Sequence, residues 1–312
     1  MEFNQLLYFC KIVEFGSIIK ASEALYVTQT SISKAIHRLE DELGVVLLER
    51  TNKGVIATEE GRELFHYAGK ILDQMDLIEG IAGKDRRRYL SVASYPFFSI
   101  SELLSAFYMR HKEDNITMKL EEGRLQLIID AVENGNADIG IVIVNNAQLK
   151  RFRNSLKYKN LEMEVLGEDT WYANVGPNSP LYHKSIVTME ALKNYPIVRI
   201  YDDYFSNLTT YIKIDGVELS ELKQKIHVND GMGLVNILYH TDAFRFGPGI
   251  SIENFRKYGI RSIPIANCDV RVTIGWIKKK NASLDDSARE MIDILQRWVS
   301  DQQALHPIES KS

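Results

Sequence analysis

The chain has little cysteine and no long apolar run. Its two cysteines, Cys10 and Cys268, stand in unrelated segments of the 312 residues, without the spacing of a metal site. We therefore expect neither a disulfide framework nor a zinc centre, and we interpret both thiols as small apolar side chains, with a redox switch as the alternative. No segment reaches the roughly twenty apolar residues that span a bilayer, and the N-terminal segment lacks a basic leader, so we expect a cytoplasmic protein that enters no membrane.

Catalytic signatures are missing as well. None of the HExxH, GxSxG, Walker or GxGxxG patterns occurs, and the seven histidines are scattered. His227 lies near Asp230 and His240 near Asp242, but neither pair has a nucleophile at a matching turn. The sequence therefore predicts no enzyme and no cofactor, and we interpret both histidines as structural or surface residues.

The chain also lacks an excess of basic residues. It has 38 Lys and Arg against 42 Asp and Glu, and its pI is near 6.0. This balance argues against a protein held on nucleic acid by bulk charge, so any DNA contact is expected to be local. With 45% hydrophobic and 26% charged residues, the composition suits two or three soluble domains.

The stretch 17–50 has the pattern of two short helices joined by a tight turn, with Ser17 as the cap of the first helix and Thr28 as the cap of the second. This layout is typical of a helix-turn-helix whose second helix reads a DNA groove. The apolar residues of the second helix share one side: Ile32, Ile36 and Leu39. An earlier helix is expected to pack behind the pair through Phe3, Leu6 or Leu7, Cys10 and Val13.

The other side of the second helix carries short hydrogen-bonding side chains and cations. Glutamine can pair bidentately with adenine, serine and threonine can bond bases or phosphates, and lysine can neutralise a phosphate. The alternative is an ordinary solvated helix face, because most surface helices are polar on one side. We predict a DNA-reading surface made of Thr28, Gln29, Thr30, Ser33, Lys34, His37 and Arg38.

A specific family resemblance rests on an ordered set of positions over about fifty residues. These positions are Gly16, Ser17, Ala21, Ala24, Leu25, Val27, Gln29, Ser33, Ile36, Leu39, Glu40, Leu43, Gly44, Leu47, Glu49, Arg50, Thr58 and Gly61. In this order they resemble the N-terminal signature of the LysR-type transcriptional regulators. The chain departs from that signature at Ser22, Thr30 and Leu48, which bears on packing and base preference.

Residues 50–57 have the pattern of a two-stranded wing, where Arg50 and Lys53 could reach DNA phosphates; a solvated hairpin is the alternative. The segment 59–82 follows with a heptad-like seam. Its predicted dimerisation residues are Leu64, Ala68, Ile71, Met75 and Ile78. The resemblance implies that this linker helix dimerises, whereas packing on its own domain is the alternative. We place the domain boundary in the charged stretch 83–88, interpreted as a solvated hinge.

From Tyr89 onward short apolar strands alternate with helices, a rhythm that predicts a mostly parallel α/β domain. The expected strands are 89–93, 116–121, 138–143, 170–175, 196–201, 225–228 and 243–246, and the chain returns through IRSIPI and VRVTIGWI to a last helix. Two such lobes resemble the effector domain of the same family, which shares the periplasmic binding protein fold. The usual glycine pair before 243–246 is missing, which weakens the transfer of ligand residues from the second lobe.

The expected organisation has three parts. Residues 1–58 form an all-α winged helix-turn-helix DNA-binding domain, and residues 59–88 form the linker and dimerisation helix with its hinge. Residues 89–312 form an α/β two-lobed, periplasmic-binding-protein-like effector-binding domain. Lobe I covers about 89–165 and 266–300, and lobe II covers about 166–265.

A ligand in such a pair of lobes would lie near the carboxyl ends of strands and near helix N-termini. The residues expected there are Ser94, Tyr95, Ser99, Tyr201, Asp202, Asn229, Asp230 and Phe246. For each of them an ordinary cap or turn is the alternative. Asp202, Asp203 and Asp230 would disfavour a simple anion unless arginine or lysine offsets them, which leaves an amine-bearing or polar neutral effector open.

Taken together, these patterns predict a sequence-specific transcriptional regulator. Its expected partners are double-stranded promoter or operator DNA, a small-molecule effector and a second copy of the chain as a homodimer, and the resemblance implies a homotetramer. A periplasmic transport receptor is the alternative for the C-terminal half, but the N-terminal helices argue against it. Neither the effector, nor the operator, nor the direction of regulation can be read from these residues.

Overall fold

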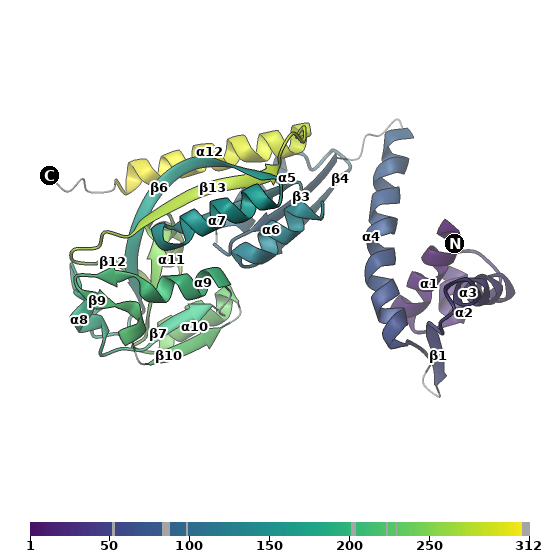
Figure 1. The fold of residues 1–312 in the computed structure, drawn as a ribbon, viewed down its shortest axis with the longest axis horizontal. Helices are drawn as coiled ribbons and strands as arrows, with labels where there is room; N and C mark the ends of the chain where they lie inside the picture. The colour runs from purple at the N-terminus through teal and green to yellow at the C-terminus, as the bar shows by residue number, and fades with distance from the viewer. Residues whose placement is uncertain are drawn as a thin grey trace. The chain divides into compact units, whose positions relative to one another are not determined.

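The computed structural model describes residues 1–51, 54–82, 88–97, 99–200, 204–222, 224–228 and 230–307. The chain divides into two compact units, Met1–Arg87 and Arg88–Ser312 (Figure 1). The described residues of each unit form a hydrophobic core of their own. Several residues of the predicted sites lie outside the described residues: Lys53, Tyr201, Asp202 and Asn229. The predicted hinge at 83–87 also lies outside them, and for Arg50 and Ile78 only the backbone is described.

The N-terminal unit consists of three helices, a two-stranded wing and a long helix. Its elements are α1 (Phe3–Phe15), α2 (Ile18–Ala24), α3 (Gln29–Leu43), the antiparallel strands β1 (Leu48–Thr51) and β2 (Gly54–Ala57), and α4 (Glu59–Ala82). The two predicted caps are confirmed: Ser17 accepts from the amide of Lys20 at 3.4 Å, and Thr28 from that of Ser31 at 3.2 Å. Each cap satisfies an amide that the first helical turn leaves unpaired.

The core of this unit lies under α3. The predicted apolar side of α3 is confirmed, because Ile32, Ile36 and Leu39 are all buried. In α1 the predicted stripe is only partly right: Leu6 and Cys10 are buried, but so are Phe9 and Ile12. Because α1 packs against α2, α3 and α4 together, its buried arc is wider than a single stripe.

The wing is attached to the helices through backbone contacts. The carboxylate of Glu40, near the end of α3, accepts from the amide of Leu47 at 2.8 Å. The amide of Val55 donates to the carbonyl of Gly16 at 2.9 Å. Gly54 has φ +131°, and a Cβ atom there would lie 2.5 Å from the Gly16 carbonyl oxygen. Glycine at position 54 therefore permits the close approach that fixes the wing beside the junction of α1 and α2.

The C-terminal unit is built on a mixed β-sheet whose two ends belong to different lobes. One end contains β3 (Arg88–Ser94), β4 (Ile116–Glu122), β5 (Ile139–Asn145) and β13 (Arg271–Lys279), with helices α5 (Ser99–Arg110), α6 (Leu125–Glu133), α7 (Asn146–Tyr158) and α12 (Asp286–Leu305). The other contains β7 (Ile197–Ile200), β10 (Lys225–Val228), β11 (Phe244–Pro248) and β12 (Arg261–Pro264), with α8 (Met189–Leu192), α9 (Tyr204–Leu208), α10 (Gly231–His240) and α11 (Ile252–Lys257). A short hairpin of β8 (Lys213–Ile214) and β9 (Val217–Glu218) adds to this second end.

The long strand β6 (Leu161–Val175) joins the two lobes. The strand order is β10-β7-β11-β6-β13-β5-β3-β4, and β12 also pairs with β6. The first part of β6 pairs with β13, and its last five residues pair with β11 and β12 (Figure 1). The sequence placed the start of this strand at residue 170. The strand begins nine residues earlier, because the polar alternation of 161–169 reflects a strand with one half-exposed face.

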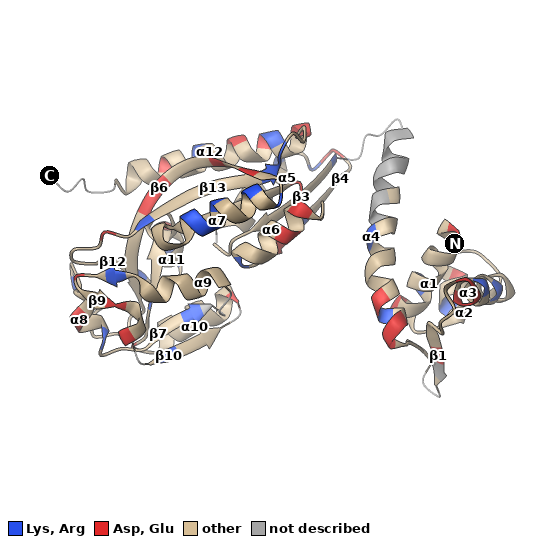
Figure 2. Ribbon diagram, viewed as in Figure 1, with Lys and Arg blue, Asp and Glu red and all other residues tan. Residues whose placement is uncertain are grey.

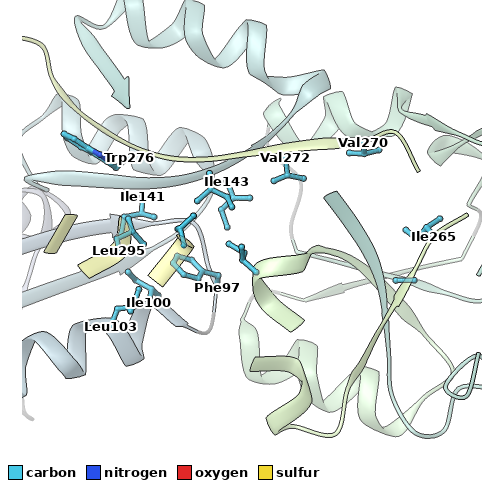
Figure 3. Close-up of a cluster of buried hydrophobic side chains, with 14 of the residues drawn as sticks. Phe97, Ile100, Leu103, Ile141, Ile143, Ile265, Val270, Val272, Trp276 and Leu295 are labelled. Atoms are coloured by element: carbon cyan, nitrogen blue, oxygen red, sulfur yellow. The ribbon is translucent and has the colours of Figure 1, made fainter. Parts of the chain in front are cut away.

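Helices cover both faces of the lobe I sheet, and the residues of β5 alternate between them. Ile141 and Ile143 pack in the cluster that includes Phe97 of the loop before α5 and Leu295 of α12 (Figure 3). Val144, on the opposite face, packs with residues of α6 and α7. This double burial explains the continuous apolar run of β5, as expected for a strand inside a sheet covered on both sides. Among the described residues, no helix has the length and apolar character needed to cross a membrane.

Candidate DNA interface and ligand pocket

The polar side of α3 forms an accessible surface on the N-terminal unit. Of the residues predicted to read DNA, six are exposed and Ser33 is half-buried. The exposed ones are Thr28, Gln29, Thr30, Lys34, His37 and Arg38. The side chains of Arg50 and Lys53 are not described, so the predicted contribution of the wing to this surface stays a prediction.

Charge is distributed unevenly along α3. Lys34 and Arg38 lie in its first two-thirds, whereas Glu40, Asp41 and Glu42 occupy its last turns. Figure 2 shows basic and acidic positions on the ribbon of each unit. A phosphate backbone attracts the first group and repels the second, and the helix dipole adds positive potential at the N-terminus. The N-terminal half of α3 is therefore the part that suits entry into a DNA groove.

Two further residues of this surface escaped the sequence interpretation. Ser31 is exposed and its hydroxyl lies 2.8 Å from that of Thr28. It precedes Lys34 by three residues and Arg38 by seven, which is the helical spacing that could have identified it. Tyr26, in the turn between α2 and α3, is 96% exposed and has φ +55°. The turn therefore presents an aromatic hydroxyl next to the N-terminus of α3.

The residues of the predicted dimerisation seam of α4 differ in their exposure: some are buried in their own unit and others are accessible. Ala68 is fully buried in the core of its own unit, and Leu64 and Leu72 pack against that core. The prediction is therefore wrong for Ala68, because α4 uses this part of the seam to pack against α1. Ile71 is 42% exposed and Met75 is half-buried, and these two positions stay available to a partner.

A cleft in the C-terminal unit opens where strands of both lobes end. Lobe I contributes the ends of β3, β4 and β5, and lobe II contributes β7 and β11. The main compartment has a volume of about 140 Å³. Trp171 and Phe246 form an aromatic wall of this compartment. Their rings are stacked at a centroid distance of 5.2 Å and an interplanar angle of 6°. The carboxyl ends of strands at such a crossover are the usual ligand position in α/β domains.

Three arginines line this compartment, and its described lining contains no aspartate or glutamate. Arg124 lies at the junction of β4 and α6. Arg199 of β7 donates from Nη2 to the hydroxyl of Thr209 at 3.0 Å. Arg245 of β11 has a buried Nη1 atom without a hydrogen-bond partner among the described residues. The arginines entered none of the sequence predictions, although Arg199 and Arg245 interrupt apolar strands, which is a detectable signal.

The structure places the predicted effector residues differently from one another. Tyr95 and Phe246 line the main compartment. Ser94 and Ser99 do not: both are buried, with their hydroxyls donating to the carbonyl of Tyr95 and the side-chain oxygen of Asn254. For these two serines the prediction is wrong, because internal partners already satisfy the hydroxyls.

Asp230 is also outside the pocket lining. Its carboxylate caps α10 by accepting from the amide of Gly233 at 2.7 Å. The negative charge of Asp230 is stabilised at this position by the amide that it accepts from and by the positive end of the helix dipole. The prediction that Asp230 contacts the effector is therefore wrong for the described pocket, because its carboxylate caps α10.

A second compartment of about 110 Å³ adjoins the first. Arg245, Tyr95 and Pro248 line both compartments. The second compartment also has Glu122, at the end of β4, and burial raises the pKa of that carboxyl group. The two compartments therefore differ in their ionisable lining residues. The first has three arginines, and the second has Arg245 together with the carboxyl group of Glu122.

Neither metal nor thiol chemistry finds support in the described part of the chain. No group of three or more His, Cys, Asp or Glu side chains there could hold a metal ion. Cys10 is buried, and desolvation raises the pKa of its thiol to about 11. At neutral pH this group is a protonated thiol, which fits its interpretation as a small apolar side chain.

Comparisons with known proteins agree with this arrangement. The family profile "Bacterial regulatory helix-turn-helix protein, lysR family" matches residues 3–62, and "LysR substrate binding domain" matches residues 90–300. The transcriptional dual regulator GltC of Bacillus subtilis is 24% identical over 96% of this chain and 98% of its own. The RuBisCO operon transcriptional regulator of Allochromatium vinosum is 24% identical over 76% of this chain and 80% of its own.

Solved structures show the same fold. The structure of full-length CbnR complexed with its target DNA has 20% sequence identity and a TM-score of 0.67, covering 96% of this chain and all of that chain. CbnR solved as a LysR family transcriptional regulator gives the same TM-score and covers 99% of that chain. With profile matches that together span most of its length, the chain belongs to the LysR family of bacterial helix-turn-helix transcriptional regulators.

Proposed function

We propose that the chain binds specific operator DNA through α3 and that a small molecule in the cleft of the C-terminal unit controls this binding. The observation that carries the DNA part is the exposed polar and basic surface on the first two-thirds of α3. Side chains such as Gln29 and Thr30 would read base edges, while Lys34 and Arg38 would contact phosphates. The cleft supports the second part, since a ligand that differs in affinity for two conformations shifts their populations.

The domain functions that we propose follow the sequence prediction. Residues 1–58 would form the DNA-binding domain, 59–88 the linker, and 89–312 the effector domain. A homodimer would place two copies of α3 on a pseudo-palindromic site, and the exposed Ile71 and half-buried Met75 support a partner along α4. A homotetramer is the further assembly that we propose from the family.

We also propose that the protein acts as a regulator in the cytoplasm and not as an enzyme. Its DNA target is located there. The cleft contains binding groups, arginines and aromatic rings, but its described lining has no cysteine or histidine. Turnover of any small molecule by the purified protein would contradict this part of the proposal.

Selection of genomic fragments by the purified full-length chain tests the DNA part. The expected result is enrichment of a few fragments that share a pseudo-palindromic site. A truncated chain that begins at Arg88 lacks α3 and should enrich none. Equal enrichment by both proteins, or no enrichment by the full chain, would refute the assignment of α3 as the reading helix.

A further inference from the structure

We propose that the cleft recognises a small organic anion, whose anionic group lies between Arg199 and Arg245. The inference rests on the proposed effector function and names the chemical class of the effector. The sequence disfavoured an anion unless arginine or lysine offset the aspartates near the cleft, and the arginines of the described lining meet that condition.

The charge of the main compartment is the first argument. Its described lining includes Arg199 and Arg245 and contains no aspartate or glutamate. Asp230, the described aspartate that the sequence placed there, is engaged in capping α10. Like charges gathered around a partly desolvated cavity repel one another, and an anion relieves this repulsion.

Arg245 supplies the second argument. Its Nη1 atom is buried and has no hydrogen-bond partner in the described structure. A buried donor without an acceptor is costly, so a native protein that retains one has a use for it. Arg245 lines both compartments, so one side chain is available to a ligand in either of them. A carboxylate can accept two parallel bonds from such a group.

Arg199 is held in position for the same task. Its Nη2 donates to the Thr209 hydroxyl at 3.0 Å, and that hydroxyl donates in turn to the carbonyl of Ser206 at 2.6 Å. These contacts fix the guanidinium group with neutral partners, so its charge is not cancelled by them. An anion that enters the cleft therefore meets a cation that is already oriented.

The size and walls of the compartment limit the rest of the ligand. Its volume of about 140 Å³ is close to that of a cavity that accommodates one benzene ring, roughly 150 Å³. Trp171 and Phe246 form a flat aromatic wall, and Leu125, Ile143 and Val272 are apolar lining residues. We therefore infer a monocarboxylate with a short chain or a single ring.

The second compartment argues against an anionic group at the other end of the ligand. Glu122 lines it, and burial already disfavours the charged form of that carboxyl group. A second carboxylate placed there would meet like charge, whereas a neutral or hydrogen-bond-donating tail would not. The ligand is thus expected to be anionic at one end only.

Binding of charge-matched small molecules to the full-length protein tests the proposal. The probes are acetate and benzoate, the amide and the amine with each carbon skeleton, and inorganic phosphate, all at millimolar concentration. We expect at least one carboxylate to raise the thermal unfolding temperature and to change the fluorescence of Trp171, with an affinity that falls as salt is added. The matching amides and amines should bind at least about tenfold more weakly. Phosphate in place of carboxylates would assign the same anion site to a phosphorylated ligand.

Arg245→Met is the decisive variant, and Arg297→Met is its control because Arg297 is exposed on α12 and does not line the cleft. We expect Arg245→Met to lower the affinity for the anion by about tenfold or more without lowering the unfolding temperature of the ligand-free protein. A structural arginine would behave differently, since its removal would destabilise the ligand-free protein. Arg245→Lys keeps the charge but loses the planar fork, so it should restore only part of the affinity.

Three results would overturn the proposal: unchanged anion binding by Arg245→Met, equal or tighter binding of the amide or amine probes, and no response to any anion. Selection of genomic fragments with the same protein distinguishes failure of the anion proposal from failure of the proposed regulator function. Intact DNA binding without a preference for anions would refute only the assignment of the cleft to an anionic ligand. Loss of DNA selection would instead refute the regulator proposal.

Discussion

At the scale of single residues, the sites depend on side chains whose surroundings the sequence does not reveal. Tyr95 and Phe246 were expected at the cleft and line it, while the hydroxyls of Ser94 and Ser99 find partners inside the fold. Local sequence shows which groups can form hydrogen bonds but not which of them are already satisfied. Arg245 is the opposite case, because a cation in an apolar strand signals a special environment whose location only the fold provides.

The residues of α3 are expected to divide into two classes by their effect on DNA binding. Gln29→Ala should relax the preference at one base position at a cost of about 1 to 3 kcal/mol on the cognate site. Lys34→Ala should weaken binding to all sequences and reduce the slope of log affinity against log salt by about 1. Ser33→Ala should resemble Gln29→Ala with a smaller effect, since Ser33 is half-buried.

Fragment selection and salt titration with each variant separate these classes. Glu63→Ala is a suitable control, because Glu63 is exposed on α4 and not on the reading surface. Identical sequence preferences and salt slopes for all variants would remove α3 from the interface.

At the scale of elements, most of the fold was predictable because periodicity and caps are local properties. The predicted strand 225–228 coincides with β10, and the predicted cap Thr28 lies directly before α3. Helix α7, by contrast, was missed: it is polar on most of its surface and buries only a narrow stripe of Gln148, Phe152 and Leu156. The first half of β6 was missed for a similar reason, since its pairing with β13 is a long-range contact. Elements stabilised by tertiary packing carry a weaker local signal.

The start of α4 permits a test of how the linker helix is fixed to the wing. A Cβ atom on Gly61 would lie 2.1 Å from the carbonyl oxygen of Leu47, so Gly61→Ala forces backbone apart. We expect a loss of about 1 to 3 kcal/mol in the free energy of unfolding. Gly69 lies in the same helix with no atom within 4 Å of its would-be Cβ. Gly69→Ala should therefore stabilise the protein, by about 0.5 to 1 kcal/mol.

Denaturant unfolding of the two variants measures both changes, and each serves as the control of the other. If Gly61→Ala were as stable as Gly69→Ala, the close contact between α4 and the wing would not exist in solution.

The same helix carries the prediction about assembly. Ile71→Asp places a charge at the exposed part of the seam, and we expect it to convert a dimer into monomers with weak DNA binding. His66→Asp introduces the same residue at another exposed position of α4 and should leave the dimer intact. Sedimentation over a range of concentrations distinguishes these outcomes. A stable dimer of Ile71→Asp would show that Ile71 takes no part in association.

At the scale of the whole molecule, the proposed DNA-reading helix and the proposed effector cleft lie in different compact units. The described residues of each unit have their own buried core, and the described lining of the cleft comes from the C-terminal unit. Communication between them must then be a coupling free energy, in which occupation of the cleft changes the equilibrium between arrangements that differ in DNA affinity.

Linkage makes this coupling measurable in both directions. If a cleft anion changes operator affinity by some factor, operator DNA must change anion affinity by the same factor, typically between about 5 and 150. Fluorescence titration of the anion with and without operator DNA gives one factor, and operator titration with and without the anion gives the other. The truncated chain from Arg88 should bind the anion with an affinity that the operator leaves unchanged. Factors of one in both titrations would show that the cleft ligand does not control DNA affinity, even where both bind.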